Sequence, residues 1–240
     1  MFPLKDNIPT LRFPAVTVTL IALNVIVYFI FQRGMLGLPD GGESGRWPVD
    51  LYALIPCEIS SECPAAGDPS PGVTVLTSMF MHGSILHLGG NMLFLWIFGN
   101  NIEDSMNRLV FLVFYLLGGV AALGLQVLMD PSSAIPTVGA SGAIAAVLGA
   151  YARLYPRARV VTVVFIIIIF TIVTLPALLV LGLWFLLQLL PAFSEPAGSG
   201  GGGVAYFAHI GGFLFGLLAI KLFANNVHED YEQAHRIPVY

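Results

Sequence analysis

Two side chains that could carry out nucleophilic chemistry, Ser141 and His209, lie in uncharged apolar stretches of the sequence. A histidine in contact with a serine can take the hydroxyl proton as the oxygen attacks a carbonyl carbon, which begins an acyl transfer. We find no Asp or Glu within a span that could orient the histidine, since Glu103 and Asp104 lie at the far end of a different apolar stretch. We therefore expect a Ser-His dyad without an orienting acid.

A second pair of polar side chains, His87 and Asn91, could stabilise the charge that such an attack creates. The two residues are four positions apart, so they share one face of a helix. Both can donate hydrogen bonds to an oxyanion, together with the backbone N–H of Ser141. His82 lies just before them, and we expect it to make a plain structural hydrogen bond.

The composition says what kind of element must hold these residues. Of the 240 residues, 57% are hydrophobic and only 10% are charged, whereas a soluble chain has roughly 25% charged residues. This scarcity of charge excludes an ordinary soluble protein, and the net charge of -4 excludes a nucleic-acid binder. The chain is predicted to be a multi-pass membrane protein, in which every polar side chain within a span is a candidate for function.

Six stretches are uncharged and close to the length that crosses a bilayer core of ~30 Å. They are residues 15–32, 85–102, 109–129, 140–154, 175–190 and 204–223, with residues 1–14 and 224–240 as polar ends. Pro176 interrupts the long apolar run before the fifth stretch, so residues 160–173 are predicted to be an interfacial or re-entrant lead-in. The expected fold is an all-α membrane protein with six transmembrane helices and a long first loop.

The distribution of Lys and Arg predicts how these helices are oriented. With the N-terminus inside, only Arg33 and Arg46 lie outside, and the other basic residues are cytoplasmic: Lys5, Arg12, Arg108, Arg153, Arg157, Arg159, Lys221 and Arg236. No small-residue cleavage site follows the first span, so it is expected to remain in the membrane. We expect both termini in the cytoplasm, and a prokaryotic plasma (inner) membrane as the location.

The two cysteines of the chain, Cys57 and Cys63, lie in the long first loop. This orientation places the loop on the extracytoplasmic side, where disulfides persist. The sequence leaves two states open, a Cys57–Cys63 disulfide and two unpaired thiols.

Small residues predict which helices touch. They recur at every fourth position in two spans, as Ser141, Ala145 and Gly149 in the fourth and Gly212 and Gly216 in the sixth. Small residues let helix backbones approach closely. The second, fourth and sixth spans all run inward, and their polar residues lie in the first two turns, at a similar depth. We therefore expect Ser141 to face His209.

Together these motifs resemble the rhomboid family of intramembrane serine proteases. The resemblance covers about Thr77 to Gly216 and rests on His82-x4-His87-x3-Asn91, Gly139-Ala140-Ser141-Gly142 and Ala208-His209-x2-Gly212-x3-Gly216. It implies a six-helix bundle with Ser141 as nucleophile and His209 as base, and with His87 and Asn91 in the oxyanion hole. It implies cleavage of single-span membrane proteins near the extracytoplasmic face. The sequence has no HExxH motif and no paired intramembrane aspartates, so neither a metal nor another cofactor is expected.

The sequence departs from the family pattern in two places. Many members have a Trp-Arg pair shortly before the second span, where this chain has Val73-Thr74; Arg46-Trp47 occurs earlier in reversed order. Some members have an aromatic residue one turn after the nucleophile, where this chain has Ala145. The resemblance therefore leaves open what orients His209. Glu103 matches an acidic residue to which we assign a structural role.

Two other functions are compatible with the composition. The first is an inactive relative that binds transmembrane segments without cutting them, but such relatives characteristically lack the serine or the histidine. The second is a small-molecule transporter, which is disfavoured because the polar residues cluster at one depth and trace no path across the bilayer.

Overall fold

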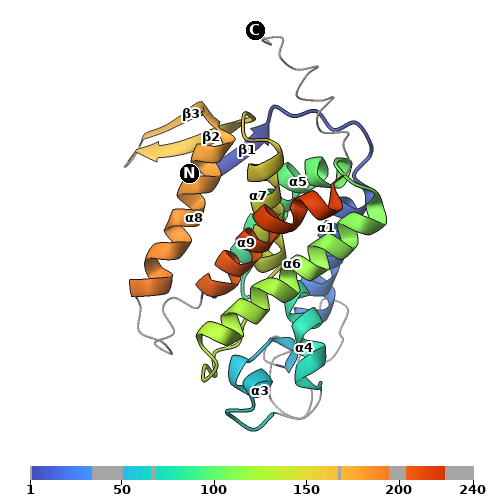
Figure 1. Cartoon of the computed structure of the whole chain (residues 1–240), viewed down its shortest axis with the longest axis vertical. Helices are drawn as coiled ribbons and strands as arrows, with labels where there is room; N and C mark the ends of the chain where they lie inside the picture. The colour runs from blue at the N-terminus through green and yellow to red at the C-terminus, as the bar shows by residue number, and fades with distance from the viewer. Residues whose placement is uncertain (1, 34–50, 66–68, 167–168, 195–203, 225–240) are drawn as a thin grey trace.

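A computed structural model of the chain describes residues 2–33, 51–65, 69–166, 169–194 and 204–224 (Figure 1). Its long helices are α1 (Ala15–Ile26) continued by η1 (Val27–Gln32), α5 (Ile85–Asp104), α6 (Arg108–Met129), α7 (Ser141–Leu154), α8 (Ala177–Ser194) and α9 (Tyr206–Phe223). The Arg46-Trp47 pair and nearly all of the predicted tail, from residue 225 onward, lie outside the described residues.

Within the described ranges, four helices are long and apolar enough to cross a membrane. They are Ala15–Gln32, Arg108–Met129, Ala177–Ser194 and Tyr206–Phe223. α5 has several polar residues, and α7 has only 14 residues. The chain is therefore a mostly helical, multi-pass membrane protein.

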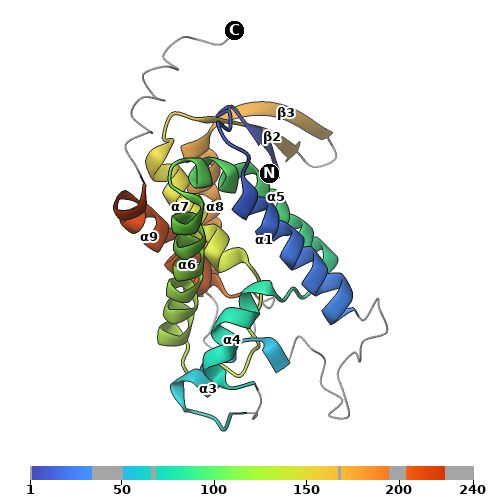
Figure 2. The same cartoon turned by 90° about the vertical axis from the view of Figure 1, so that its right-hand side faces the viewer.

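The centre of the bundle is α7, which packs against α5, α6, α8 and α9 (Figures 1 and 2). From Gly142 to Leu154, every α7 residue except Arg153 is buried. Most of these residues are alanine or glycine, so the neighbouring helices can approach α7 closely. The small-residue composition thus places the helix that begins at Ser141 inside the protein.

A three-stranded antiparallel sheet caps one end of the bundle (Figure 1). Its strands are β1 (Phe2–Asp6), β2 (Arg159–Ile166) and β3 (Ile169–Pro176). The expectation of an all-α chain was therefore wrong, because most of residues 160–173, predicted as an interfacial or re-entrant lead-in, form β2 and β3. The β-branched residues of this segment favour strands, and the hairpin pairs their backbone groups. Pro176 ends β3, and α8 follows directly, running to Ser194 rather than ending at 190.

Two carboxylates tie the N-terminal segment to this end of the bundle. Asp6 is 7% exposed, and its Oδ2 accepts hydrogen bonds from the Tyr151 hydroxyl of α7 at 2.6 Å and from Asn101 Nδ2 of α5. Glu103 accepts from the backbone N–H groups of Val16 at 3.0 Å and Thr17 at 2.8 Å. These two N–H groups lie in the first turn of α1, so Glu103 caps a neighbouring helix and has a structural role.

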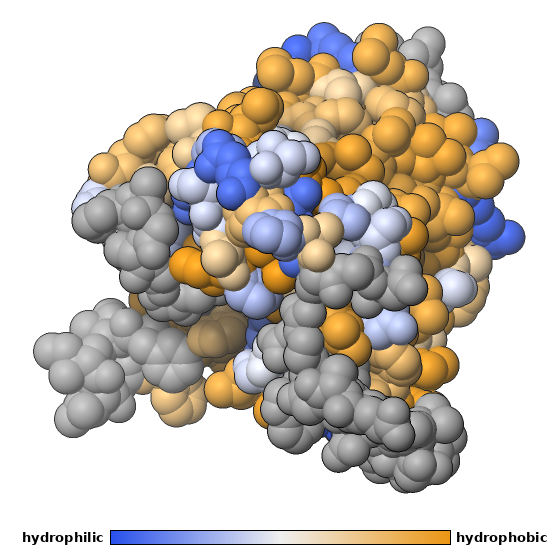
Figure 3. All heavy atoms as spheres, turned by 90° about the horizontal axis from the view of Figure 1, so that it is seen from below, coloured by the Kyte–Doolittle hydropathy of each residue, from blue (hydrophilic) through white to orange (hydrophobic). Residues whose placement is uncertain are grey.

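The opposite end carries short helices of the first loop, α3 (Pro56–Ser60) and α4 (Pro71–Thr77) followed by η2 (Ser78–Phe80) (Figure 2). Viewed from this end, hydrophilic residues gather near the middle of the face, beside broad hydrophobic areas (Figure 3). This distribution fits a membrane protein whose flanks face lipid and whose end faces water.

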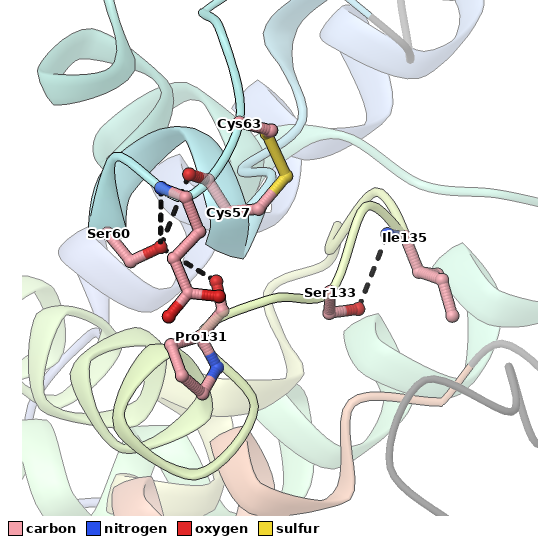
Figure 4. The surroundings of a disulfide bond; sticks show 7 residues. Cys57, Ser60, Cys63, Pro131, Ser133 and Ile135 are labelled. Atoms are coloured by element: carbon pink, nitrogen blue, oxygen red, sulfur yellow. Dashed lines mark hydrogen bonds between the residues drawn. A yellow bond between two sulfur atoms is a disulfide. The ribbon is translucent and has the colours of Figure 1, made fainter.

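Cys57 and Cys63 form a disulfide that closes the turn after α3 (Figure 4). α3 itself is attached to the loop that precedes α7: Ser60 Oγ donates to the carbonyl oxygen of Pro131 at 2.7 Å, and the Cys57 N–H donates to that of Ser133 at 3.0 Å. The first loop therefore supports the segment that leads to Ser141.

Candidate active site

Ser141 and His209 meet where α7 and α9 begin. Ser141 is the first residue of α7, and His209 lies in the first turn of α9. The Ser141 Oγ and the His209 Nε2 are 2.7 Å apart, a distance typical of a good hydrogen bond. The structure thus joins a hydroxyl and an imidazole in the geometry of a nucleophile and its general base.

The contact depends on direct backbone packing between α7 and α9. A Cβ atom added at Gly216 would lie 1.8 Å from the carbonyl oxygen of Ala146, and one at Gly212 would lie 2.0 Å from that of Gly142. Gly149, on α7, would meet the carbonyl oxygen of Phe213 at 2.0 Å. No larger residue fits at these positions without moving a helix. The small-residue stripes expected from the sequence therefore lie in this interface.

Gly139 shapes the turn that presents Ser141. Its φ is 124°, a conformation that side-chain-bearing residues rarely adopt. A Cβ at this position would also lie 2.8 Å from the ring of His87. The Gly139 N–H donates to the carbonyl oxygen of Ser78 at 2.9 Å, which attaches the turn to η2. The turn leaves the N–H groups of the first α7 turn free of helical partners, as at any helix start.

His87 and Asn91 come from the first two turns of α5 and line the same cavity as Ser141 and His209. Asn91 is 8% exposed, and its Nδ2 has no hydrogen-bond partner among the described residues. An unpaired, buried donor is costly unless something binds it. Asn91 therefore offers a donor to a carbonyl oxygen that enters the cavity beside Ser141.

The cavity has a volume of ≈ 460 Å³ and is walled by α5, α6, α7, α8 and α9. This volume is within the range of small-ligand sites. In the part of its wall that the structure describes, the titratable side chains are His87 and His209, and apolar residues such as Phe94, Leu148 and Trp184 make up much of the rest. Two imidazoles, a hydroxyl and a carboxamide thus converge in mostly apolar surroundings.

Two residues that the sequence reasoning missed contact the other side of His209. Gln188 Oε1 lies 2.8 Å from His209 Nδ1, and the ring centroid of Trp184 lies 5.8 Å from that of the imidazole. Both residues come from α8. Trp184 supplies the aromatic neighbour that Ala145 cannot. Their spacing of four residues on one helix face, with the polar side chain inside a predicted span, was the available signal.

His82 makes structural hydrogen bonds through its backbone and not through its ring. Its ring nitrogens have no partner in the described part of the chain, and the ring packs edge-on against His87 with centroids 5.2 Å apart. Its backbone N–H and carbonyl groups instead pair with the side chain of Gln32, at 3.0 and 3.1 Å. His82 thus anchors the start of α5 to the end of η1 through its backbone.

No metal site is formed by the described residues, among which no three His, Cys, Asp or Glu side chains are grouped suitably.

Comparisons with known proteins agree with the motifs. The family model described as Rhomboid domain matches residues 71–226. Rhomboid protein 1, mitochondrial, of Saccharomyces cerevisiae is 35% identical over 98 residues, which cover 39% of this chain and 28% of that protein. Presenilin-associated rhomboid-like protein A, mitochondrial, of Danio rerio is 34% identical over 87 residues, covering 35% and 23%. Rhomboid-like protein 11, chloroplastic, of Arabidopsis thaliana is 38% identical over 69 residues, covering 29% and 24%. The chain thus matches about a quarter of the length of these relatives.

Proposed function

Because the chain belongs to the rhomboid family, we propose that it is an intramembrane serine endopeptidase that hydrolyses peptide bonds in or near the transmembrane segments of other proteins. The observation that carries this proposal is the 2.7 Å contact between Ser141 Oγ and His209 Nε2. A hydroxyl and an imidazole at this distance, beside a cavity with unpaired donors, suit acyl transfer.

In the proposed reaction, Ser141 Oγ attacks the carbonyl carbon of the scissile peptide while His209 Nε2 takes the hydroxyl proton. The resulting oxyanion accepts hydrogen bonds from Asn91 Nδ2, from His87 and from the Ser141 N–H. The tetrahedral intermediate then collapses, the C–N bond breaks, and the imidazolium of His209 protonates the leaving amine. Water attacks the acyl-enzyme in the second half of the reaction and gives its proton to His209. The acyl C–O bond then breaks as His209 returns the proton to Ser141 Oγ, which releases the carboxylic acid and restores the hydroxyl.

The proposed topology has six membrane crossings, in which α5 and α7 complete the set of α1–η1, α6, α8 and α9. Both termini are cytoplasmic in this topology, and the end carrying α3 and α4 faces the extracytoplasmic side. The site would then open toward that side, from which water and a single-span substrate could reach Ser141. The excess of basic residues at the sheet end and the disulfide at the opposite end support this orientation. A prokaryotic plasma (inner) membrane is the proposed location, and neither a metal nor another cofactor is required.

The alternative is a catalytically inactive relative that binds transmembrane segments. The presence of both Ser141 and His209, already in hydrogen-bond contact, favours the protease.

Labelling with a fluorophosphonate, together with cleavage of a fluorogenic transmembrane substrate in proteoliposomes, tests the proposal. Ser141→Ala and His209→Ala are expected to abolish both signals. Ser105→Ala is a matched control, because it removes a buried hydroxyl whose hydrogen bond, to the Ile102 carbonyl oxygen, lies at the sheet end. Cleavage that persists in Ser141→Ala would refute the proposal, and labelling that persists would identify another nucleophile.

A further inference from the structure

The side chain of Gln188 is held between His209 and its own helix. Its Nε2 donates to the carbonyl oxygen of Trp184, one turn earlier in α8, at 3.1 Å. Its Oε1 lies 2.8 Å from His209 Nδ1. The amide is therefore oriented by its helix, with the oxygen toward the imidazole.

This orientation determines which nitrogen of His209 carries the proton. An amide oxygen can only accept a hydrogen bond, so His209 Nδ1 must be the donor. In the neutral imidazole the other nitrogen, Nε2, then carries a lone pair. That lone pair faces Ser141 Oγ at 2.7 Å. A continuous chain of hydrogen bonds thus runs from Ser141 through His209 and Gln188 to the backbone of α8.

We propose that Gln188 is a positioning residue, which holds His209 in the tautomer that can accept the proton of Ser141. This inference rests on the proposed function and assigns to a neutral amide the orienting task that a carboxylate performs in a Ser-His-Asp triad. Trp184 has a complementary task, since its ring lies beside the imidazole and restricts its rotation. Gln188 selects the proton position, and Trp184 limits the orientation of the ring.

The origin of these contacts has a consequence for catalysis. Gln188 and Trp184 belong to α8, whose buried residues are Ala177, Val180 and Leu181, all near its first turn. Among the described residues, the part of α8 near His209 contacts α9 through side chains, as in the Gln188–His209 hydrogen bond and the Phe185–Phe213 ring stack. The base is therefore fully oriented only while α8 lies against α9.

The first test observes the tautomer without relying on activity. Protein labelled with ¹⁵N-histidine reports the protonation of each ring nitrogen by NMR, and His209→Ala identifies the signal of His209. The wild type is expected to show His209 protonated at Nδ1, and Gln188→Leu a mixture of tautomers. Leu187→Ala is the matched control, because Leu187 is the preceding residue of α8 and is 54% exposed; it should resemble the wild type. A wild-type His209 protonated at Nε2, or an unchanged signal in Gln188→Leu, would overturn the proposal.

The second test measures cleavage against pH. Gln188→Leu is expected to lower kcat by about tenfold or more, with KM changed by less than about twofold, because positioning affects the transition state more than binding. Gln188→Glu keeps an acceptor and adds a negative charge that stabilises the imidazolium. It should therefore move the acidic limb of the kcat/KM profile up by about one pH unit and retain most of kcat above that limb. His87 is the other titratable group in the described wall, and it is unchanged in every variant. If both Gln188 variants had the wild-type profile and rate, the assignment would be wrong.

The two tests separate this inference from the proposed function. If Ser141→Ala is inactive but both Gln188 variants behave like Leu187→Ala, the protease stands and the role of Gln188 falls. If Ser141→Ala still cleaves substrate, the proposed function falls. The NMR spectra then still decide whether Gln188 sets the tautomer of His209.

Discussion

The helix that carries His209 meets its two neighbours in different ways. Along α7, glycines bring the backbones into direct contact, and a Cβ at Gly149 would lie 2.0 Å from a carbonyl oxygen of α9. Along α8, aromatic and amide side chains make the contact, as in the stacked pair Phe185–Phe213 with ring centroids 4.5 Å apart. A Cβ at Gly182 of α8 would meet no atom within 4 Å. In Figure 1, α8 correspondingly stands to one side of α7 and α9.

This difference separates two requirements of a Ser-His pair. The separation of the Ser141 and His209 backbones is set by the direct packing of α7 against α9. The orientation of the His209 imidazole depends on α8, and α8 contacts α9 through side chains. A bundle built this way can move α8 without separating the nucleophile from its base.

The largest effect is expected from a branched side chain in the α7–α9 interface. Gly216→Val places atoms where the carbonyl oxygen of Ala146 lies 1.8 Å from the new Cβ. Overpacking costs about 1–3 kcal/mol where side chains can move, and a backbone obstacle should raise the loss to about 3 kcal/mol or more. Thermal unfolding in detergent and substrate cleavage measure the outcome, and both stability and activity should fall. A variant as stable as the wild type would show that the interface is not backbone packing.

The close packing of α7 against α9 could be predicted from the sequence. Ser141, Gly149, Gly212 and Gly216 recur at helical spacing, and small residues in membrane helices have few roles other than close packing. The polar residues of the site stood out for a related reason, since His87, Asn91 and His209 interrupt stretches that otherwise contain mainly apolar side chains. Local pattern and cost in lipid were sufficient to find them.

The hairpin and the contacts between α8 and α9 could largely not be predicted from the sequence. Residues 160–173 are apolar and β-branched, which suits an interfacial segment as well as a hairpin. The hairpin pairs with β1, which lies near the N-terminus and far from the hairpin in the sequence. The residues of the hairpin do not indicate which strand they will pair with. Gln188 and Trp184 acquire their roles only because α8 lies beside α9. Spacing on one helix shows that they share a face but not which helix that face contacts.

The next effect concerns how the N-terminal start of α8 is held at the sheet end. Asp6 pairs with Val160 of the hairpin, and the Ala177 N–H at the start of α8 donates to the carbonyl oxygen of Ala158 at 2.8 Å. Burial raises the pKa of Asp6 from 3.8 to about 6, although hydrogen bonds from Tyr151 and Asn101 oppose the rise. The folded protein therefore binds this proton more tightly than the unfolded chain does.

Stability should consequently fall as pH rises through this window, because the deprotonated carboxylate is disfavoured only in the folded state. The contribution of Asp6 is expected to decline by up to about 3 kcal/mol between about pH 4 and pH 6, and then to level off. Asp6→Asn does not titrate, so its unfolding free energy should lack this component. Thermal melts of both proteins across the window provide the measurement. Identical pH dependence in the two proteins would contradict the raised pKa of Asp6.

A smaller effect is expected from the disulfide, which supports the nucleophile side of the comparison. Cys57 lies in α3, and its backbone N–H donates to the carbonyl oxygen of Ser133, upstream of Ser141 (Figure 4). Replacing both Cys57 and Cys63 with serine removes a short closed loop, whose stabilisation is about 2 kcal/mol. The melting temperature should fall by a few degrees, with a modest loss of cleavage. Treating the wild type with reductant should produce the same change and leave the double variant unaffected. A wild type insensitive to reductant would indicate that the loop before α7 does not depend on this link.

The smallest effect tests the open side of α8 directly. Gly182→Ala adds a methyl group where the structure has no atom within 4 Å, and alanine favours a helix over glycine by at most about 1 kcal/mol. Stability should therefore stay level or rise slightly, and cleavage should not change. The matched change Gly149→Ala should lower stability, because its Cβ would meet the backbone of Phe213 at 2.0 Å. Equal destabilisation by the two substitutions would mean that α8 packs as closely as α7. The distance and the orientation of the Ser141–His209 pair would then be held by the same kind of contact.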